Sequence, residues 1–201
     1  MKRLLIFVGL VVLLSGCGWM YELGGGASSD FDIAEAGLTV PEFTFVNQDD
    51  EPYGTEQLTG QYWLANLIFT HCPSVCPTMT PNMRNLQTAM QEEGIEMGYI
   101  SFTVDPERDT PELLKSYATN VGANGETWKF LTGYDIEEIT DLSMTAFASP
   151  VQPLEDDIGH TTAFFLVDPE GNVIRKYDGL QSDQEPIIAD LIETVQSNEA
   201  E

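Results

Sequence analysis

Apolar runs and amphipathic stretches alternate along this chain. Residues 62–70 are almost continuously apolar, a pattern typical of a strand buried on both faces of a sheet. The next apolar residues recur at spacings of four, three and four, which predicts one face of a helix that ends at Gly94: Met79, Met83, Leu86 and Met90. Residues 97–104 then predict a second buried strand.

The alternation continues toward the C-terminus. Asp109 and Thr110 cap a predicted helix that starts with Pro111 and closes at a glycine. Turn residues at 168–172 join two strands into a hairpin, and a strand over 43–46 adds a hairpin at the N-terminal edge. The remaining predicted strands are 128–131, 163–167 and 173–177, and the remaining helices are 136–147 and 187–195. This order predicts an α/β fold in which helices cover both faces of a mixed sheet.

The first sixteen residues form a targeting signal. Two basic residues precede an apolar run over 4–14, which is within the length of a secretory signal and short for a membrane span. The box Leu14-Ser15-Gly16-Cys17 resembles the bacterial lipoprotein signal, in which the cysteine is lipidated. We therefore expect residues 1–16 to be removed as a signal peptide and Cys17 to become a lipid anchor.

The expected lipid anchor predicts the cellular location of the rest of the chain. Residues 17–37 include three consecutive glycines and predict a lipidated N-terminus with a flexible tether, ahead of a folded domain over 38–198. A lipidated cysteine with more than one acyl chain attaches stably to a membrane. We expect the domain at the outer face of the bacterial cytoplasmic membrane, where thiols are exposed to oxidation.

The net charge and the number of cysteines exclude some classes of function. The 201 residues carry 8 Lys and Arg against 33 Asp and Glu, a formal net charge of −25. So acidic a surface repels phosphate backbones and excludes a nucleic-acid partner. A solvated coat explains the acidity more simply than an acidic docking face does. Three cysteines are too few for a disulfide-rich scaffold.

Two of these cysteines, Cys72 and Cys76, follow the first buried strand at the end of the sheet where function gathers. Their spacing on a helix-like turn is about 6 Å, so the thiols can form a disulfide or converge on one soft metal ion. Pro77 favours Cys76 as the N-cap of the following helix, a placement that lowers a thiol pKa. A purely structural pair is the alternative.

The chain offers two histidines to complete such a site. His71 adjoins Cys72 on an extended segment, so its side chain points away and a local role is favoured. His160 precedes the predicted strand 163–167, and it reaches the cysteines only if that strand lies beside 62–70. Spacing alone leaves a ligand role and a structural role for His160 equally open.

Three motifs carry a resemblance. Residues 69–77, residues 104–111, and residues 159–162 with 166–169 resemble, in order and spacing, the Sco (SenC) family. The resemblance implies a thioredoxin-like (peroxiredoxin-like) fold and a role in assembling the copper A centre of cytochrome c oxidase. It also implies the copper ligands Cys72, Cys76 and His160. Asp105 matches a functionally sensitive acidic position of the family, although an Asp-Pro turn that ends a strand explains it equally well.

The chemistry of this ligand set agrees with copper. Soft thiolates select Cu(I), imidazole also suits copper, and three ligands leave a structural zinc site incomplete. Oxidising the redox thiol pair Cys72 and Cys76 to a disulfide would destroy the site. The expected function is copper delivery to, or maturation of, the copper A subunit. The alternative is a thiol–disulfide oxidoreductase that reduces that subunit's cysteines.

Two further interpretations are weaker. A peroxidase would need a Pro-x-x-x-Thr-x-x-Cys pattern, which the chain lacks. The methionine thioethers on the helix after the cysteines could bind Cu(I), but their helical spacing with Leu86 favours a core position.

Overall fold

The structure, a computed structural model, describes residues 30–154 and 157–198. The predicted signal peptide, Cys17 and most of the tether lie outside the described residues. The strands are β1 (Thr44–Asn47), β2 (Pro52–Gly54), β3 (Trp63–Ile68), β4 (Gly98–Thr103), β5 (Trp128–Thr132), β6 (Gln152–Pro153), β7 (Ile158–Gly159), β8 (Ala163–Val167) and β9 (Val173–Asp178). The helices are α2 (Thr55–Leu58), α3 (Cys76–Glu92), α4 (Pro111–Val121), α5 (Ile136–Phe147) and α6 (Glu185–Asn198), after a 3-10 turn at Ala34–Ala36.

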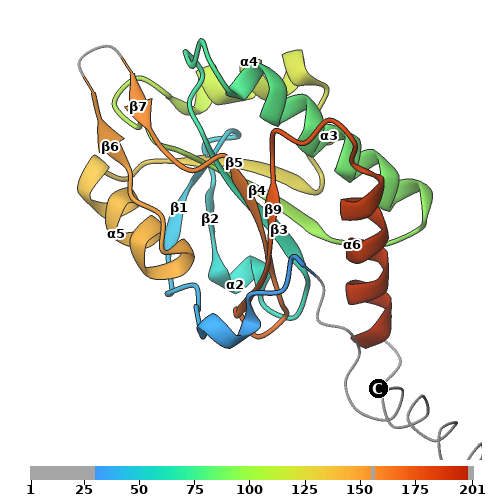
Figure 1. Cartoon of the computed structure of the whole chain (residues 1–201). Coiled ribbons are helices and arrows are strands. Elements are labelled where there is room, and N and C mark those ends of the chain that lie inside the picture. Colours follow the sequence, from blue (N-terminus) through green and yellow to red (C-terminus); the bar gives the residue numbers. More distant parts are fainter. Residues whose placement is uncertain (1–29, 155–156, 199–201) are drawn as a thin grey trace, which may run out of the picture. The chain divides into compact units, whose positions relative to one another are not determined.

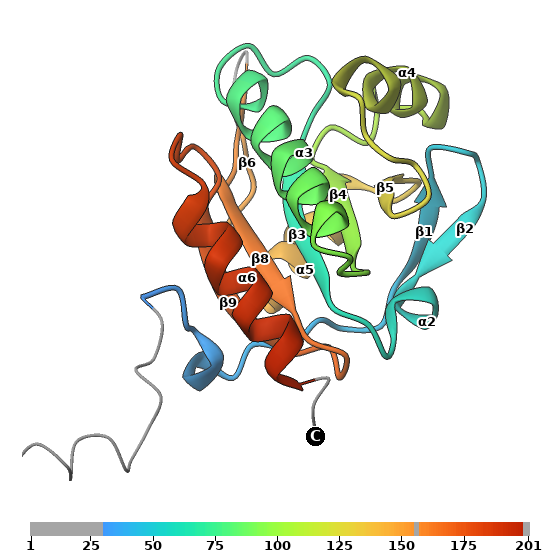
Figure 2. The same cartoon turned by 90° about the vertical axis from the view of Figure 1, so that its right-hand side faces the viewer.

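Seven strands form one mixed sheet in the order β2-β1-β5-β4-β3-β8-β9. The central strands β3, β4 and β5 are parallel, and β8 runs antiparallel to β3. Helices α3 and α6 cover one face of this sheet and α5 covers the other (Figures 1 and 2). Every residue of β3 and β4 is buried, as the continuous apolar runs predict for strands covered on both faces. The predicted α/β sheet and its N-terminal hairpin, β1 with β2, are confirmed.

Helix α3 starts one residue earlier than the sequence predicts. Cys76 is already helical and Val75 holds the N-cap position, so the prediction that Cys76 caps this helix is wrong. The carbonyl of Val75 accepts hydrogen bonds from the N–H groups of Thr78 and Met79, while the Cys76 N–H donates to the sulfur of Cys72. These bonds overcome the bias of a residue before proline against helical geometry.

The cap of α4 also differs from the prediction. The Thr110 side chain accepts a hydrogen bond from the Leu113 N–H and caps the helix alone. Asp109 is fully buried, and its carboxylate bonds to the ends of β3 and β4 instead. A short hairpin of β6 and β7 was not predicted, because two-residue strands carry no readable periodicity.

The register between β3 and β8 brings the distant histidine to the cysteine end of the sheet. Trp63 pairs with Val167 and Ala65 with Phe165 in this antiparallel ladder. Continued past the strand ends, the same register sets His160 level with Thr70. The condition on which the sequence argument depended, that 163–167 lies beside 62–70, is therefore met.

Candidate metal centre

The two thiols lie on the turn that connects β3 to α3. The Cys72 N–H donates to the Phe69 carbonyl over 3.3 Å, and the Cys76 N–H donates to Cys72 Sγ over 3.4 Å. Both cysteines are free thiols, with only 8% of Cys72 and 2% of Cys76 exposed. The turn thus places two sulfur atoms that are not joined in a disulfide at the N-terminus of α3.

His160 is held in one orientation and one tautomer. Its Nδ1 lies 2.8 Å from the Thr161 carbonyl, which can only accept, so Nδ1 carries the proton. The ring packs edge-on against Phe69, with centroids 5.8 Å apart. Burial lowers the pKa of His160, although the Thr161 carbonyl and Asp157 act in the opposite direction. A neutral imidazole with a fixed Nδ1–H is the form in which histidine binds a metal through Nε2.

The Nε2 atom of His160 is the one part of the ring left without a partner. It is buried, and no described residue forms a hydrogen bond with it. A buried polar atom without a partner is costly and needs an explanation.

The cysteine sulfur atoms supply that explanation. The ligand atoms of Cys72, Cys76 and His160 all lie within 4.8 Å of one another. They form the one group of three or more His, Cys, Asp or Glu side chains so arranged in the part of the chain that the structure describes. Two sulfur atoms and an orphaned imidazole nitrogen fit a soft metal ion with three protein ligands.

The two thiols differ in acidity. Burial opposes ionisation of Cys72, but hydrogen bonds from Cys76, Ser74 and Val75 outweigh it and lower the pKa of Cys72 below the ordinary value. Burial raises the pKa of Cys76 strongly, and the charges of Cys72 and Asp109 raise it further. The helix N-terminus therefore activates Cys72 rather than the predicted Cys76.

His71 has the local role that the sequence favours. Its side chain is exposed, and its Nδ1 lies 3.0 Å from the Thr70 hydroxyl. The hydroxyl donates its own proton to Asp109, so Nδ1 of His71 is the donor to Thr70. His71 is not a member of the ligand cluster.

Asp105 follows β4 in an Asp-Pro turn, as the structural one of the two interpretations of this residue predicts. Its carbonyl accepts hydrogen bonds from the N–H groups of Arg108 and Asp109. Its carboxylate lies 3.7 Å from the Arg108 guanidinium. Burial raises the pKa of Asp105, and the Arg108 charge acts against this. A direct functional role for Asp105 stays a prediction.

Asp109 is the residue that the sequence analysis missed. It accepts hydrogen bonds from the Thr70 N–H and from the hydroxyls of Thr70 and Thr103. One signal in the sequence could have identified it: Thr110 alone suffices as the cap before Pro111, which leaves Asp109 without a local role.

The methionines of α3 belong to the core, as their spacing predicts. Met79 and Met83 are fully buried and Met90 is 1% exposed, beside the fully buried Leu86. They belong to the same apolar cluster as strands β3 and β4. Because these side chains are buried in the apolar core, we assign their thioethers to packing.

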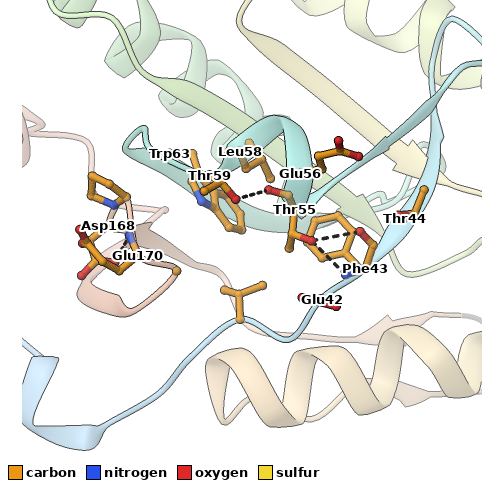
Figure 3. Close-up of a pocket in the computed structure, with 13 residues that line it drawn as sticks. Glu42, Phe43, Thr44, Thr55, Glu56, Leu58, Thr59, Trp63, Asp168 and Glu170 are labelled. Carbon is orange, nitrogen blue, oxygen red and sulfur yellow. Dashed lines mark hydrogen bonds between the residues drawn. The ribbon is translucent and has the colours of Figure 1, made fainter.

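A cavity of about 700 Å³ lies at the other end of β3 and takes no part in the cysteine site. It is lined by the first residue of β3, by α2 and by the turn after β8 (Figure 3). The Asp168 carboxylate at its edge is already bonded to the N–H groups of Glu170 and Asn172. The candidate metal ligands therefore lie at the end of the sheet opposite to this cavity.

A mixed sheet with two free thiols on a Cys-x-x-x-Cys turn after β3, and with a histidine just before the antiparallel strand β8, is the framework of a thiol-based metal-binding protein. The SCO1/SenC family model matches residues 32–196, and the chain belongs to this family.

Solved structures support the same assignment. A SCO1/SenC family lipoprotein from Bacillus anthracis is 39% identical, with a TM-score of 0.75 over 79% of this chain and 95% of that one. BsSco, a member of the Sco family of cytochrome c oxidase assembly proteins with a disulfide switch, is 40% identical, with a TM-score of 0.72 over 80% and 92%. Bradyrhizobium japonicum ScoI with copper bound is 27% identical, with a TM-score of 0.63 over 77% and 98%. The thioredoxin-like fold implied by the sequence resemblance is thereby confirmed.

The described residues contain no helix that is long and apolar enough to cross a membrane.

Proposed function

We propose that this protein binds one copper ion through Cys72, Cys76 and His160 and uses it to mature the copper A centre of cytochrome c oxidase. One observation carries the proposal: the ligand atoms of His160 and of two free thiols lie within 4.8 Å of one another, and the Nε2 atom of His160 is buried without a hydrogen-bond partner. Copper is the cargo, so the site must release it as well as bind it. The related ScoI holds copper, and the related BsSco is an oxidase assembly protein, which support the cargo and the partner.

The site combines firm binding with a route for release. Both thiols must lose their protons to bind copper, and the high pKa of Cys76 makes its proton the harder one to remove. Transfer of two electrons from the two thiolates to an oxidant, such as a partner disulfide that is reduced to two thiols, forms the Cys72–Cys76 disulfide and leaves His160 as the remaining ligand. Copper occupancy and thiol oxidation therefore exclude each other.

The acidity of Cys72 favours a second candidate, reduction of the oxidase subunit's cysteines. The Cys72 thiolate attacks one sulfur of a partner disulfide, and the other partner sulfur leaves as a thiolate. Cys76 then loses its proton and attacks Cys72, which forms the internal disulfide and frees the second partner sulfur. The partner gains two electrons and this protein loses two, with no metal required.

Anaerobic copper titration separates these functions. Reduced protein should take up one ion per chain and, with Cu(II), develop a thiolate charge-transfer band, while the disulfide form should take up far less. Turnover of a disulfide substrate by metal-free protein, with no tight copper binding, would replace the first function by the second.

The lipid anchor is a separate proposal. We infer that Cys17 carries the lipid and that the domain works at the outer face of the cytoplasmic membrane, supported by the signal-like N-terminus and by the related lipoprotein. Radioactive palmitate supplied to expressing bacteria should label the wild-type protein, and Cys17→Ser should lose the label. Cys72→Ser is the matched control and should keep it.

A further inference from the structure

A buried carboxylate lies directly behind the cysteine turn. Asp109 is fully buried, and one of its oxygens lies 3.0 Å from the backbone N–H of Thr70. The Thr70 hydroxyl donates to its other oxygen, and the Thr103 hydroxyl donates to the first. Because Thr70 sits inside the Phe69–Cys72 turn, one carboxylate fixes that turn to the end of β4.

Helix capping does not account for this carboxylate, because Thr110 caps α4 without it. Its charge also has no cationic partner among the described residues. The nearby Arg108 pairs with Asp105, at 3.7 Å, and not with Asp109. The Asp109 charge is balanced only by hydrogen-bond donors, and burial limits its screening by solvent.

The charge lies next to the turn that carries the ligand sulfur atoms. Asp109 bonds to both the backbone and the side chain of Thr70, two residues before Cys72, and the Cys72 N–H closes the same turn on the Phe69 carbonyl. Asp109 therefore opposes negative charge at the site as well as holding the turn.

We propose that Asp109 is a positioning residue that also sets the oxidation-state preference of the site, in favour of Cu(II). The inference rests on the proposed copper site. Two thiolates and a neutral imidazole give a net charge of −1 with Cu(I) and zero with Cu(II). A fixed negative charge nearby repels the first complex and not the second, so it stabilises Cu(II) relative to Cu(I).

The test is Asp109→Asn, which removes the charge and keeps the side-chain shape. We expect the ratio of Cu(II) to Cu(I) affinity to fall about tenfold, which is a rise of about 59 mV in the one-electron midpoint potential. Glu112→Gln, on the exposed surface of α4, makes the same change of charge in solvent and should leave the potential unchanged. Thr103→Val removes a hydroxyl donor but keeps the charge, so it should lower stability without raising the potential.

The outcomes separate this inference from the proposed function. If the wild-type protein takes up no copper, the proposed function fails and this inference fails with it. If copper-loaded wild type and Asp109→Asn share one potential, the inference alone is overturned. Should Asp109→Asn fail to fold, Asp109→Ser, which leaves room for water beside Thr70 and Thr103, makes the same charge test.

Discussion

The backbone N–H of Cys76 donates a hydrogen bond to Cys72 Sγ over 3.4 Å. This contact makes two chemically identical side chains unequal, because it stabilises a thiolate at Cys72 while burial opposes one at Cys76. We therefore expect Cys72 to make the first contact with a metal ion or a disulfide, and Cys76 to complete the site afterwards.

This inequality predicts the order of alkylation in reduced, metal-free protein. With a lowered pKa, Cys72 ionises at a lower pH than an ordinary thiol, and Cys76 with its raised pKa ionises above it. As pH rises, iodoacetamide should therefore modify Cys72 first. Mass spectrometry of briefly labelled protein measures the order, and earlier or equal labelling of Cys76 would contradict it.

Removal of the imidazole should weaken Cu(II) binding. His160→Ala should lower Cu(II) affinity by more than about tenfold, since even loss of a second-shell partner costs about 10–100-fold in metal affinity. His71→Ala is the matched control, because His71 adjoins Cys72 but lies outside the ligand cluster. Competition titrations with a chelator measure both variants. Equal affinities for His160→Ala and wild type would remove His160 from the site.

The position of His160 depends on a glycine far along the chain. The Gly179 N–H donates to the Thr162 carbonyl over 3.0 Å, and a Cβ on Gly179 would meet that oxygen at 2.3 Å and the Phe164 ring at 2.8 Å. Gly179→Ala should therefore cost about 1–3 kcal/mol of stability and displace the segment that carries His160.

Thermal unfolding and Cu(II) titration of Gly179→Ala measure the two effects. Gly125→Ala is the control, because a Cβ there meets open space. Unchanged stability and affinity in Gly179→Ala would show that this contact does not position the histidine.

The sequence predicted the fold almost completely because its signals are local. Continuous apolar runs identified β3 and β4, and Thr110 with Pro111 marked the start of α4. The sequence could not predict the register in which the strands pair. His160 reaches the cysteines only through the pairing of β8 with β3, which no local pattern encodes.

The same limit explains the two errors at the site. From the sequence, Asp109 is predicted to cap a helix. Only the structure, in which the ends of β3 and β4 lie side by side, shows that it accepts hydrogen bonds from Thr70 and Thr103. The acidity of Cys72 depends on the direction of one N–H group four residues later. The first relationship is tertiary and the second depends on the exact geometry of one turn, whereas the methionine stripe, a helical periodicity, was predicted from spacing alone.

That stripe gives a prediction about stability. Met79→Ala should lower the free energy of unfolding by about 2–5 kcal/mol, as for other truncations in a packed core, and leave one copper ion per chain. Met144→Ala is the control, because Met144 is 48% exposed. Denaturant unfolding and copper analysis measure the pair. A stable Met79→Ala variant that loses copper would make Met79 a ligand.

The central claim is that two sulfur atoms and one imidazole nitrogen bind the same copper ion. X-ray absorption spectroscopy of the copper-loaded protein measures the ligands directly, with His160→Ala compared under the same conditions. The predicted spectrum of the Cu(II) form shows two sulfur ligands and an imidazole, and the imidazole signal is lost in His160→Ala. Copper with a single sulfur ligand, or an imidazole signal that persists in His160→Ala, would contradict the account.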